Sequence, residues 1–181
     1  MNSWKIRKIV SKEKKCEPQI SKTAFINNKA EIKGKVYIGD NCSIGKSKII
    51  SETNHNIYIG RNSVVKEYVL ICSKDNTSIF KNTQINNIKD IYIGDKVFIS
   101  SEVIIHGPTL ISNGVYIGNN SAIMNSKIGE NCVIQDKVII CNVDIPPETC
   151  IPSKSVIDSI EKLNFVIAEI KHLPNLKLSM A

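Results

Sequence analysis

An isoleucine recurs at nearly every sixth position through the C-terminal half of this 181-residue chain. From Ile93 to Ile157 the sequence divides into units that each begin with isoleucine: IGDKVF, ISSEVI, IHGPTL, ISNGVY, IGNNSA, IMNSK, IGENCV, IQDKVI, ICNVD, IPPETC and IPSKSV. The fifth place is usually small or β-branched, as at Val97, Thr109 and Ser121. A short fixed period of this kind is typical of a solenoid, in which each structural unit stacks on its neighbours.

The period of six decides between the regular structures. Helices repeat apolar residues every three to four positions and strands every two, so a six-residue unit accommodates a short strand and a turn. Three units make one triangular coil, and stacking the coils places Ile105 over Ile123. A single coil cannot bury its apolar face, whereas a stack can. We therefore predict a mainly β fold, a parallel β-helix whose corners absorb the one-residue deletions in IMNSK and ICNVD.

The same pattern predicts the boundaries of the solenoid. Residues 1–20 are charged and unpatterned, and we expect a lead-in there, followed by the β-helix over residues 21–157. The hexads fail at about residues 73–90, where we predict a loop insertion. From residue 158 to 181 the apolar spacing becomes helical, and we predict a C-terminal α-helix and tail with Asp158 or Ser159 as the N-cap.

Composition narrows the range of partners. The net charge is +7, but the lysines are spread along the coils without the aromatic interleaving of a nucleic-acid platform, so we expect no nucleic-acid partner. No apolar run approaches the roughly 18 residues of a membrane span, and residues 1–15 lack the apolar stretch of a signal peptide. We expect one cytoplasmic domain with no membrane partner.

The chain has six cysteines, and their spacing matches neither a zinc module nor a compact disulfide framework. Cys42 and Cys132 occupy the small fifth place of their units, in GDNCSIG and GENCVIQ. We predict that these two side chains are buried core thiols.

Two segments resemble a known family. VIIHGPTLISNGVYIGNNSAIMNSKIGENCVI and VDIPPETCIPSKSVID are similar to segments of the γ-class carbonic anhydrases, above all their carboxysomal relatives, and the similarity covers roughly residues 26–160. The resemblance implies a left-handed β-helix, a homotrimer and a zinc ion at each subunit interface. Three histidines, two from one chain and one from its neighbour, bind that zinc in the family and leave one position for water.

Carried over to this chain, the ligand set is altered. His106, before Gly-Pro, matches the third ligand, whereas Ser101 and Cys72 stand at the other two ligand positions. Glu52 matches a family aspartate that precedes the first ligand, and Asp75 lies at a suitable distance for an acidic proton shuttle. The resemblance thus implies zinc, or another divalent metal, with CO2 and bicarbonate as substrates.

The spacing adds an independent expectation about the site. Ile71 and Ile105 should occupy the same corner of successive coils, so Cys72 and His106, each one residue later, should stack on one another. A thiolate and an imidazole in that position suit a soft divalent metal. The alternative is that Cys72 is an inert thiol and His106 a hydrogen-bonded structural histidine.

Three functions remain open from the sequence. The first is metal-dependent CO2 hydration of the γ-carbonic anhydrase type, and the second is a trimeric scaffold that has lost the chemistry, since fold does not imply function. The third is a hexapeptide-repeat acyltransferase, in which His106 would deprotonate an acceptor hydroxyl or amine. Metal content discriminates the first function, and coenzyme A binding discriminates the third.

Overall fold

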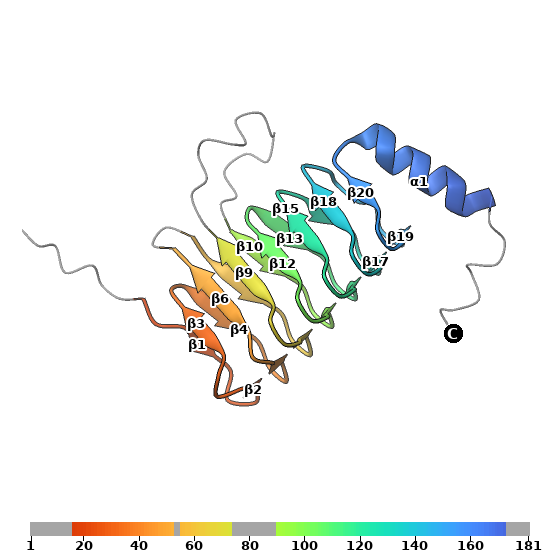
Figure 1. Cartoon of the computed structure of the whole chain (residues 1–181). Coiled ribbons are helices and arrows are strands. Elements are labelled where there is room, and N and C mark those ends of the chain that lie inside the picture. Colours follow the sequence, from red (N-terminus) through yellow and green to blue (C-terminus); the bar gives the residue numbers. More distant parts are fainter. Residues whose placement is uncertain (1–15, 53–54, 74–89, 173–181) are drawn as a thin grey trace, which may run out of the picture.

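The computed structural model describes residues 16–52, 55–73 and 90–172. In these ranges the chain winds as a parallel-strand solenoid of about seven coils, and a single α-helix follows the last coil (Figure 1). Each coil contributes a short strand to each of three sheets, here called A, B and C, except that the last coil meets sheet A only through a single bridge between Ile128 and Ile145. The mainly β fold predicted from the six-residue period is confirmed.

The strands pair with strands of the next coil rather than with their neighbours in sequence. Sheet A consists of β1 (Gln19–Ile20), β4 (Val36–Ile38), β7 (Ile57–Ile59), β10 (Ile91–Ile93), β13 (Thr109–Ile111) and β16 (Lys127–Ile128). Sheet B consists of β2 (Phe25–Ile26), β5 (Ser43–Ile44), β8 (Val64–Val65), β11 (Phe98–Ile99), β14 (Tyr116–Ile117), β17 (Val133–Ile134) and β19 (Cys150–Ile151). Sheet C consists of β3 (Glu31–Lys33), β6 (Lys48–Ser51), β9 (Leu70–Ser73), β12 (Ile104–His106), β15 (Ala122–Met124), β18 (Ile139–Cys141) and β20 (Val156–Ile157).

The core is a stack of isoleucine layers inside the triangle. Ile105 lies between Ile71 and Ile123 in register, as the period predicts, and all three side chains are fully buried. Cys42 and Cys132 are also fully buried, which confirms the prediction that they are core thiols. Burial raises the pKa of both thiols, because a thiolate would lose its hydration there.

The five-residue units fall at the corner between sheets C and A. Asn125 and Asn142 follow β15 and β18 and adopt left-handed backbone angles, with φ of 46° and 59°. The Asn125 Nδ2 amide donates a hydrogen bond of 2.6 Å to Asn142 Oδ1, which links the shortened corners of two successive coils. The corner absorbs the deletion, and the isoleucines stay in register.

Helix α1 (Ile160–His172) lies beyond the final coil (Figure 1). Ser159 is its N-cap, because its Oγ accepts a hydrogen bond of 3.3 Å from the backbone N–H of Lys162. Leu163 is buried, and Val166 and Ile167 pack against the core, so the helix covers the open end of the solenoid. Within the described chain, no helix is long and apolar enough to cross a membrane.

The predicted boundaries can be compared only in part. Strand β1 begins at Gln19, within the predicted lead-in, and pairs with β4. Ser73 ends β9 and Asp90 precedes β10, so residues 74–89 of the predicted loop insertion lie outside the described residues, as do residues 1–15 and 173–181.

Candidate functional site

The outer face of sheet C carries a column of exposed aliphatic side chains. The same register position on successive strands holds Leu70, Ile104, Ala122, Ile139 and Val156, of which Ala122 is half-buried and the others are exposed. Ile104 and Val156 are 45% and 47% exposed. A contiguous apolar strip of this kind is unusual on the surface of a monomer and is typical of an interaction surface.

A second column on the same face brings the predicted metal ligands together. Ile50, Cys72, His106, Met124 and Cys141 are paired in register along β6, β9, β12, β15 and β18. All five residues are half-buried. The prediction that Cys72 and His106 stack on successive coils is therefore confirmed.

The backbone at the corner orients the His106 ring. Its Nδ1 lies 2.9 Å from the carbonyl oxygen of Gly107, which is only an acceptor, so Nδ1 carries the proton and donates it. The neutral ring then has its lone pair on Nε2. The backbone carbonyl of His106 accepts a 2.6 Å hydrogen bond from the hydroxyl of Thr109, which holds the strand end in place. The His106 imidazole is thus oriented for use as a base or as a ligand.

The other predicted site residues lie elsewhere. Ser101 is in the turn between β11 and β12, at the opposite end of β12 from His106, where its backbone N–H donates to Asn119 Oδ1 at 3.2 Å. Glu52 is exposed, directly after β6 in the coil before Cys72, and its backbone N–H donates to the Ser73 carbonyl at 3.2 Å. Asp75 lies outside the described residues. One chain therefore brings Cys72 and His106 together without Ser101.

A metal site needs more donors than this pair. Zinc in catalytic sites takes three protein ligands and a water. Within residues 16–52, 55–73 and 90–172, no group of three or more His, Cys, Asp or Glu side chains is placed to hold a metal ion. The donors among the described residues of a single chain do not by themselves complete the zinc site that the resemblance implies.

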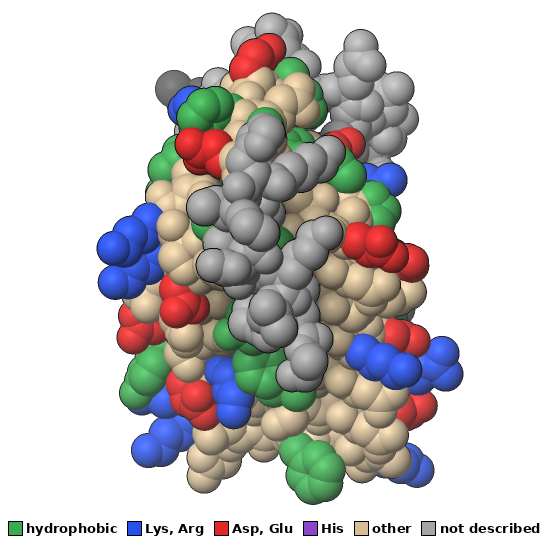
Figure 2. Space-filling model, turned by 90° about the vertical axis from the view of Figure 1, so that its right-hand side faces the viewer, with side chains coloured by type: hydrophobic (Ala, Val, Ile, Leu, Met, Phe, Trp, Pro, Cys, Tyr) green, Lys and Arg blue, Asp and Glu red, His purple; other side chains and the backbone are tan. Residues whose placement is uncertain are grey.

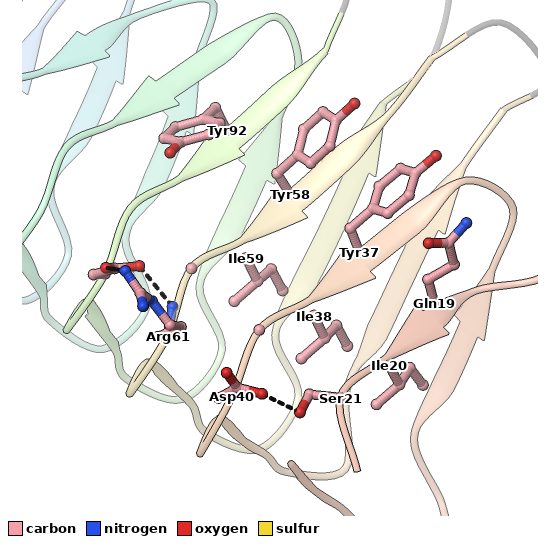
Figure 3. A pocket seen from close by; sticks show the side chains of 13 residues that line it. Gln19, Ile20, Ser21, Tyr37, Ile38, Asp40, Tyr58, Ile59, Arg61 and Tyr92 are labelled. Atoms are coloured by element: carbon pink, nitrogen blue, oxygen red, sulfur yellow. Dashed lines mark hydrogen bonds and ion pairs between the residues drawn. The ribbon is translucent and has the colours of Figure 1, made fainter. Parts of the chain in front are cut away.

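Sheet A carries a second candidate site that the sequence prediction missed. A groove of about 640 Å³ runs along the solenoid axis across β1, β4, β7 and β10. Tyr37, Tyr58 and Tyr92 form one row, and Ser21, Asp40 and Arg61 form the opposite row (Figure 3). We call this the tyrosine groove. The sequence does carry a trace of it, since Tyr-Ile-Gly occurs at Tyr37, Tyr58 and Tyr92, but the same tripeptide at Tyr116 belongs to sheet B.

Each row of the groove is organised by contacts between coils. The Tyr37 and Tyr58 rings stack with their centroids 4.8 Å apart, whereas Tyr92 is tilted by 43° with its centroid 6.2 Å from Tyr58. Opposite them, Asp95 accepts a 2.7 Å hydrogen bond from the backbone N–H of Arg61 and lies 3.4 Å from its guanidinium. The Ser21 hydroxyl donates to Asp40. Contacts between successive coils therefore hold the side chains of both rows in place.

Comparison with known proteins identifies the fold. No protein-family model and no curated protein matches the chain. The chain is similar over 88% of its length to 88% of a "putative acetyltransferase" from Bacillus cereus, with a TM-score of 0.61 and 20% identity. The chain has the hexapeptide-repeat, left-handed β-helix fold.

Two further solved structures have lower TM-scores. A hexapeptide transferase family protein from Anaplasma phagocytophilum is 18% identical, with a TM-score of 0.41, over 87% of this chain and 89% of that one. A UDP-N-acetylglucosamine O-acyltransferase from Moraxella catarrhalis is 15% identical, with a TM-score of 0.33, over 77% of this chain and 65% of that one. The match to the Bacillus cereus protein supports the hexapeptide-repeat β-helix fold, and the carbonic anhydrase identity predicted from the sequence is not supported.

Proposed function

We propose that this protein is an acyltransferase of the hexapeptide-repeat class, with His106 as its general base. The observation that carries the proposal is the His106 imidazole, whose Nδ1 donates to the Gly107 carbonyl and whose Nε2 therefore has the lone pair. The ring is half-buried beside an exposed apolar strip, where a partner surface would exclude water from it. The fold similarity to the Bacillus cereus protein supports the same class.

The chemistry follows from the orientation of the ring. Nε2 takes the proton from an acceptor hydroxyl or amine as its oxygen or nitrogen attacks the carbonyl carbon of an acyl-coenzyme A thioester. A tetrahedral intermediate forms, the carbon–sulfur bond breaks, and the coenzyme A thiolate leaves with the proton from the imidazolium. The Gly107 carbonyl keeps the ring in one orientation while Nε2 gains and loses that proton.

We also propose that the working form is a homotrimer in which sheet C of each copy faces a neighbouring copy. The column of Leu70, Ile104, Ile139 and Val156 exposes aliphatic surface that association would remove from water. His106 lies in the adjoining column, so a second copy seated on sheet C would contribute side chains directly beside the base. On this proposal the active site is incomplete in a single chain.

The test separates binding from chemistry. Coenzyme A at 1 mM should raise the melting temperature of the wild-type protein, because a ligand at a hundred times its Kd adds about 2.7 kcal/mol. Acyl transfer from acetyl-coenzyme A to a panel of alcohols and amines is followed by mass spectrometry. In His106→Asn the thermal shift should remain while transfer falls by roughly 10²- to 10⁴-fold.

Met124→Leu is the matched control, since Met124 is the half-buried neighbour of His106 on the next strand but has no basic nitrogen. This variant should keep both the thermal shift and the transfer activity. The proposal fails if wild-type protein shows neither a thermal shift nor transfer with millimolar acetyl-coenzyme A.

A second candidate function is supported by the position of Cys72 beside His106. This is the metal-dependent hydration of CO2 that the family resemblance implies. Bound zinc would supply a water whose pKa is lowered to about 7. Cys72 and His106 would hold the metal with a third donor from a neighbouring copy, and Ser101, at the other end of β12, is the residue that the resemblance places there.

Metal content distinguishes this second candidate from the first. Elemental mass spectrometry of the native protein should find close to one zinc per chain, and Cys72→Ala and His106→Ala should each lose it. Cys16→Ala, which removes an exposed thiol well before Cys72 in the sequence, should not lower the zinc content. Absence of metal from the wild-type protein grown with zinc would rule out this candidate and leave acyl transfer standing.

A further inference from the structure

We propose that the tyrosine groove on sheet A binds an extended, neutral oligosaccharide that lies along the solenoid axis. The groove is on a different sheet from His106, and this proposal does not depend on acyl transfer there. Its volume of about 640 Å³ lies in the range of small-molecule sites, which is roughly 300–1,000 Å³.

The aromatic row offers apolar contacts at a repeat of one ring per coil. Tyr37 and Tyr58 stack face to face and present their ring edges, whereas Tyr92 is turned out of the stack and is 49% exposed. In Figure 3 the hydroxyls of Tyr37 and Tyr58 point away from the Asp40–Arg61 row, and Tyr92 leans in the opposite direction. A pyranose ring, with its C–H groups on one face, would stack on the Tyr92 ring.

The opposite row supplies the polar half of the same recognition. The Arg61 side chain is 65% exposed, and its pairing with Asp95 sets the direction of the guanidinium. Asp40 is exposed at the neighbouring coil and is held by the Ser21 hydroxyl. Carboxylate acceptors and a guanidinium donor at successive coils complement the hydroxyl groups that line the edges of a sugar chain.

The strip between the two rows is formed by the ends of β4 and β7. Gly39 and Gly60 follow the buried isoleucines of β4 and β7, and a Cβ on Gly60 would stand 2.5 Å from Asp95 Oδ1 and from the Gly94 backbone. Glycine is therefore required at this position for the coils to approach.

The charges of the groove argue against a polyanion as its ligand, and its backbone hydrogen bonds argue against a peptide. The groove sets two carboxylates, Asp40 and Asp95, against one guanidinium, so it does not attract a polyanion despite the positive net charge of the chain. On the face drawn in Figure 2, which is the right-hand side of the view in Figure 1, acidic and basic side chains are interspersed. A peptide normally binds a sheet at its edge through backbone hydrogen bonds. Here Ile57 N–H and Gly60 N–H already donate to Lys35 and Ile93 carbonyls of adjacent coils.

The experiment uses the full-length protein and isothermal titration calorimetry. The probes are β-1,4-linked hexasaccharides of glucose, mannose and N-acetylglucosamine at millimolar concentration, with a heparin hexasaccharide as the polyanionic comparison. At least one neutral hexasaccharide should bind, and Tyr92→Ala should weaken that binding by about tenfold, the scale of one aromatic contact. Arg61→Ala should weaken it as well.

Tyr116→Ala is the matched control, because Tyr116 is an outward-facing tyrosine stacked on Phe98 on sheet B, outside the groove. This variant should bind like the wild-type protein. The proposal is overturned if no neutral hexasaccharide binds, if Tyr92→Ala binds unchanged, or if the heparin fragment binds more tightly. A change of oligomeric mass in Tyr92→Ala would also overturn it, since the groove would then be a subunit contact.

Discussion

Sheets A and C are built by the same coils, yet their outer faces have different chemistry. Both turn isoleucines inward, such as Ile59 on β7 and Ile105 on β12. Outward, sheet C presents aliphatic side chains with Cys72 and His106, whereas sheet A presents tyrosines opposite Asp40 and Arg61. The inward positions of every coil must fill one continuous core, so they vary little. The outward positions have no such constraint, and each face is available for a separate function.

The largest expected effect is on assembly through sheet C. Ile104→Asp combined with Ile139→Asp should dissociate the proposed homotrimer into folded monomers, because burying two carboxylates without partners is strongly unfavourable. Light scattering after gel filtration measures the mass, and far-ultraviolet circular dichroism checks the fold. Tyr92→Asp, on the outer face of sheet A, is the control and should keep the assembled mass. An unchanged mass in the double variant would contradict the assignment of sheet C as the interface.

The next largest effect is a difference in stability between substitutions at an inward-facing and an outward-facing position of sheet C. Ile105→Ala should lower the free energy of unfolding by roughly 2–5 kcal/mol, because Ile105 is fully buried between Ile71 and Ile123. Urea denaturation measures the loss. Ile104→Ala, one residue earlier and half exposed, should cost much less when both substitutions are made in an Ile139→Asp background that weakens the proposed interface. Equal losses of unfolding free energy in the two variants would contradict the assignment of Ile105 to the core and Ile104 to the surface.

A smaller effect compares the aromatic contacts of sheets A and B. Tyr58→Ala removes contacts with two rings, Tyr37 and Tyr92, whereas Tyr116→Ala removes one, with Phe98. Each aromatic pair contributes about 0.5–1.5 kcal/mol beyond area burial, so Tyr58→Ala should be the more destabilising substitution. Thermal denaturation of both variants checks the order, and the reverse order would show that the tyrosine row does not hold the coils together.

The smallest effect is a pH dependence that arises in the core. Burial raises the pKa of Cys132 above its usual value of 9.0, so the folded state binds the proton more tightly than the unfolded chain. The resulting stability is fully present below about pH 9 and is lost as the pH rises through the folded pKa. Urea denaturation at increasing alkaline pH should show this decline, and Cys132→Ala should reduce it. An unchanged decline in Cys132→Ala would contradict this origin of the pH dependence.

The sequence correctly predicted that Cys72 and His106 stack on each other, but it could not predict where Ser101 lies relative to them. Cys72 and His106 follow Ile71 and Ile105, and the buried isoleucines must stay in register, so their outward neighbours stack as expected. Ser101 shares no such position, because it stands in a turn five residues before His106. Its place in any site depends on how copies of the chain assemble, which the repeat does not encode.

The tyrosine groove was not predicted because its members are unevenly spaced in the chain. Tyr37 and Tyr58 are 21 positions apart and Tyr58 and Tyr92 are 34 positions apart, yet each pair is in register on adjacent strands. An identical Tyr-Ile-Gly tripeptide at Tyr116 lies on another sheet. The local sequence therefore does not reveal which outward side chains share a face.

By itself, the six-residue period determined the parallel solenoid, its isoleucine core, the buried thiols and the stacking of Cys72 on His106. Burial is the reason, because an inward position that fails to match the coils beside it would break the core at that level. Only the tertiary structure decided that aliphatic side chains align on sheet C, that tyrosines line a groove on sheet A, and that α1 covers the last coil. Outward side chains contribute little to the core, so their grouping is set by how the coils stack, not by the period that makes them stack.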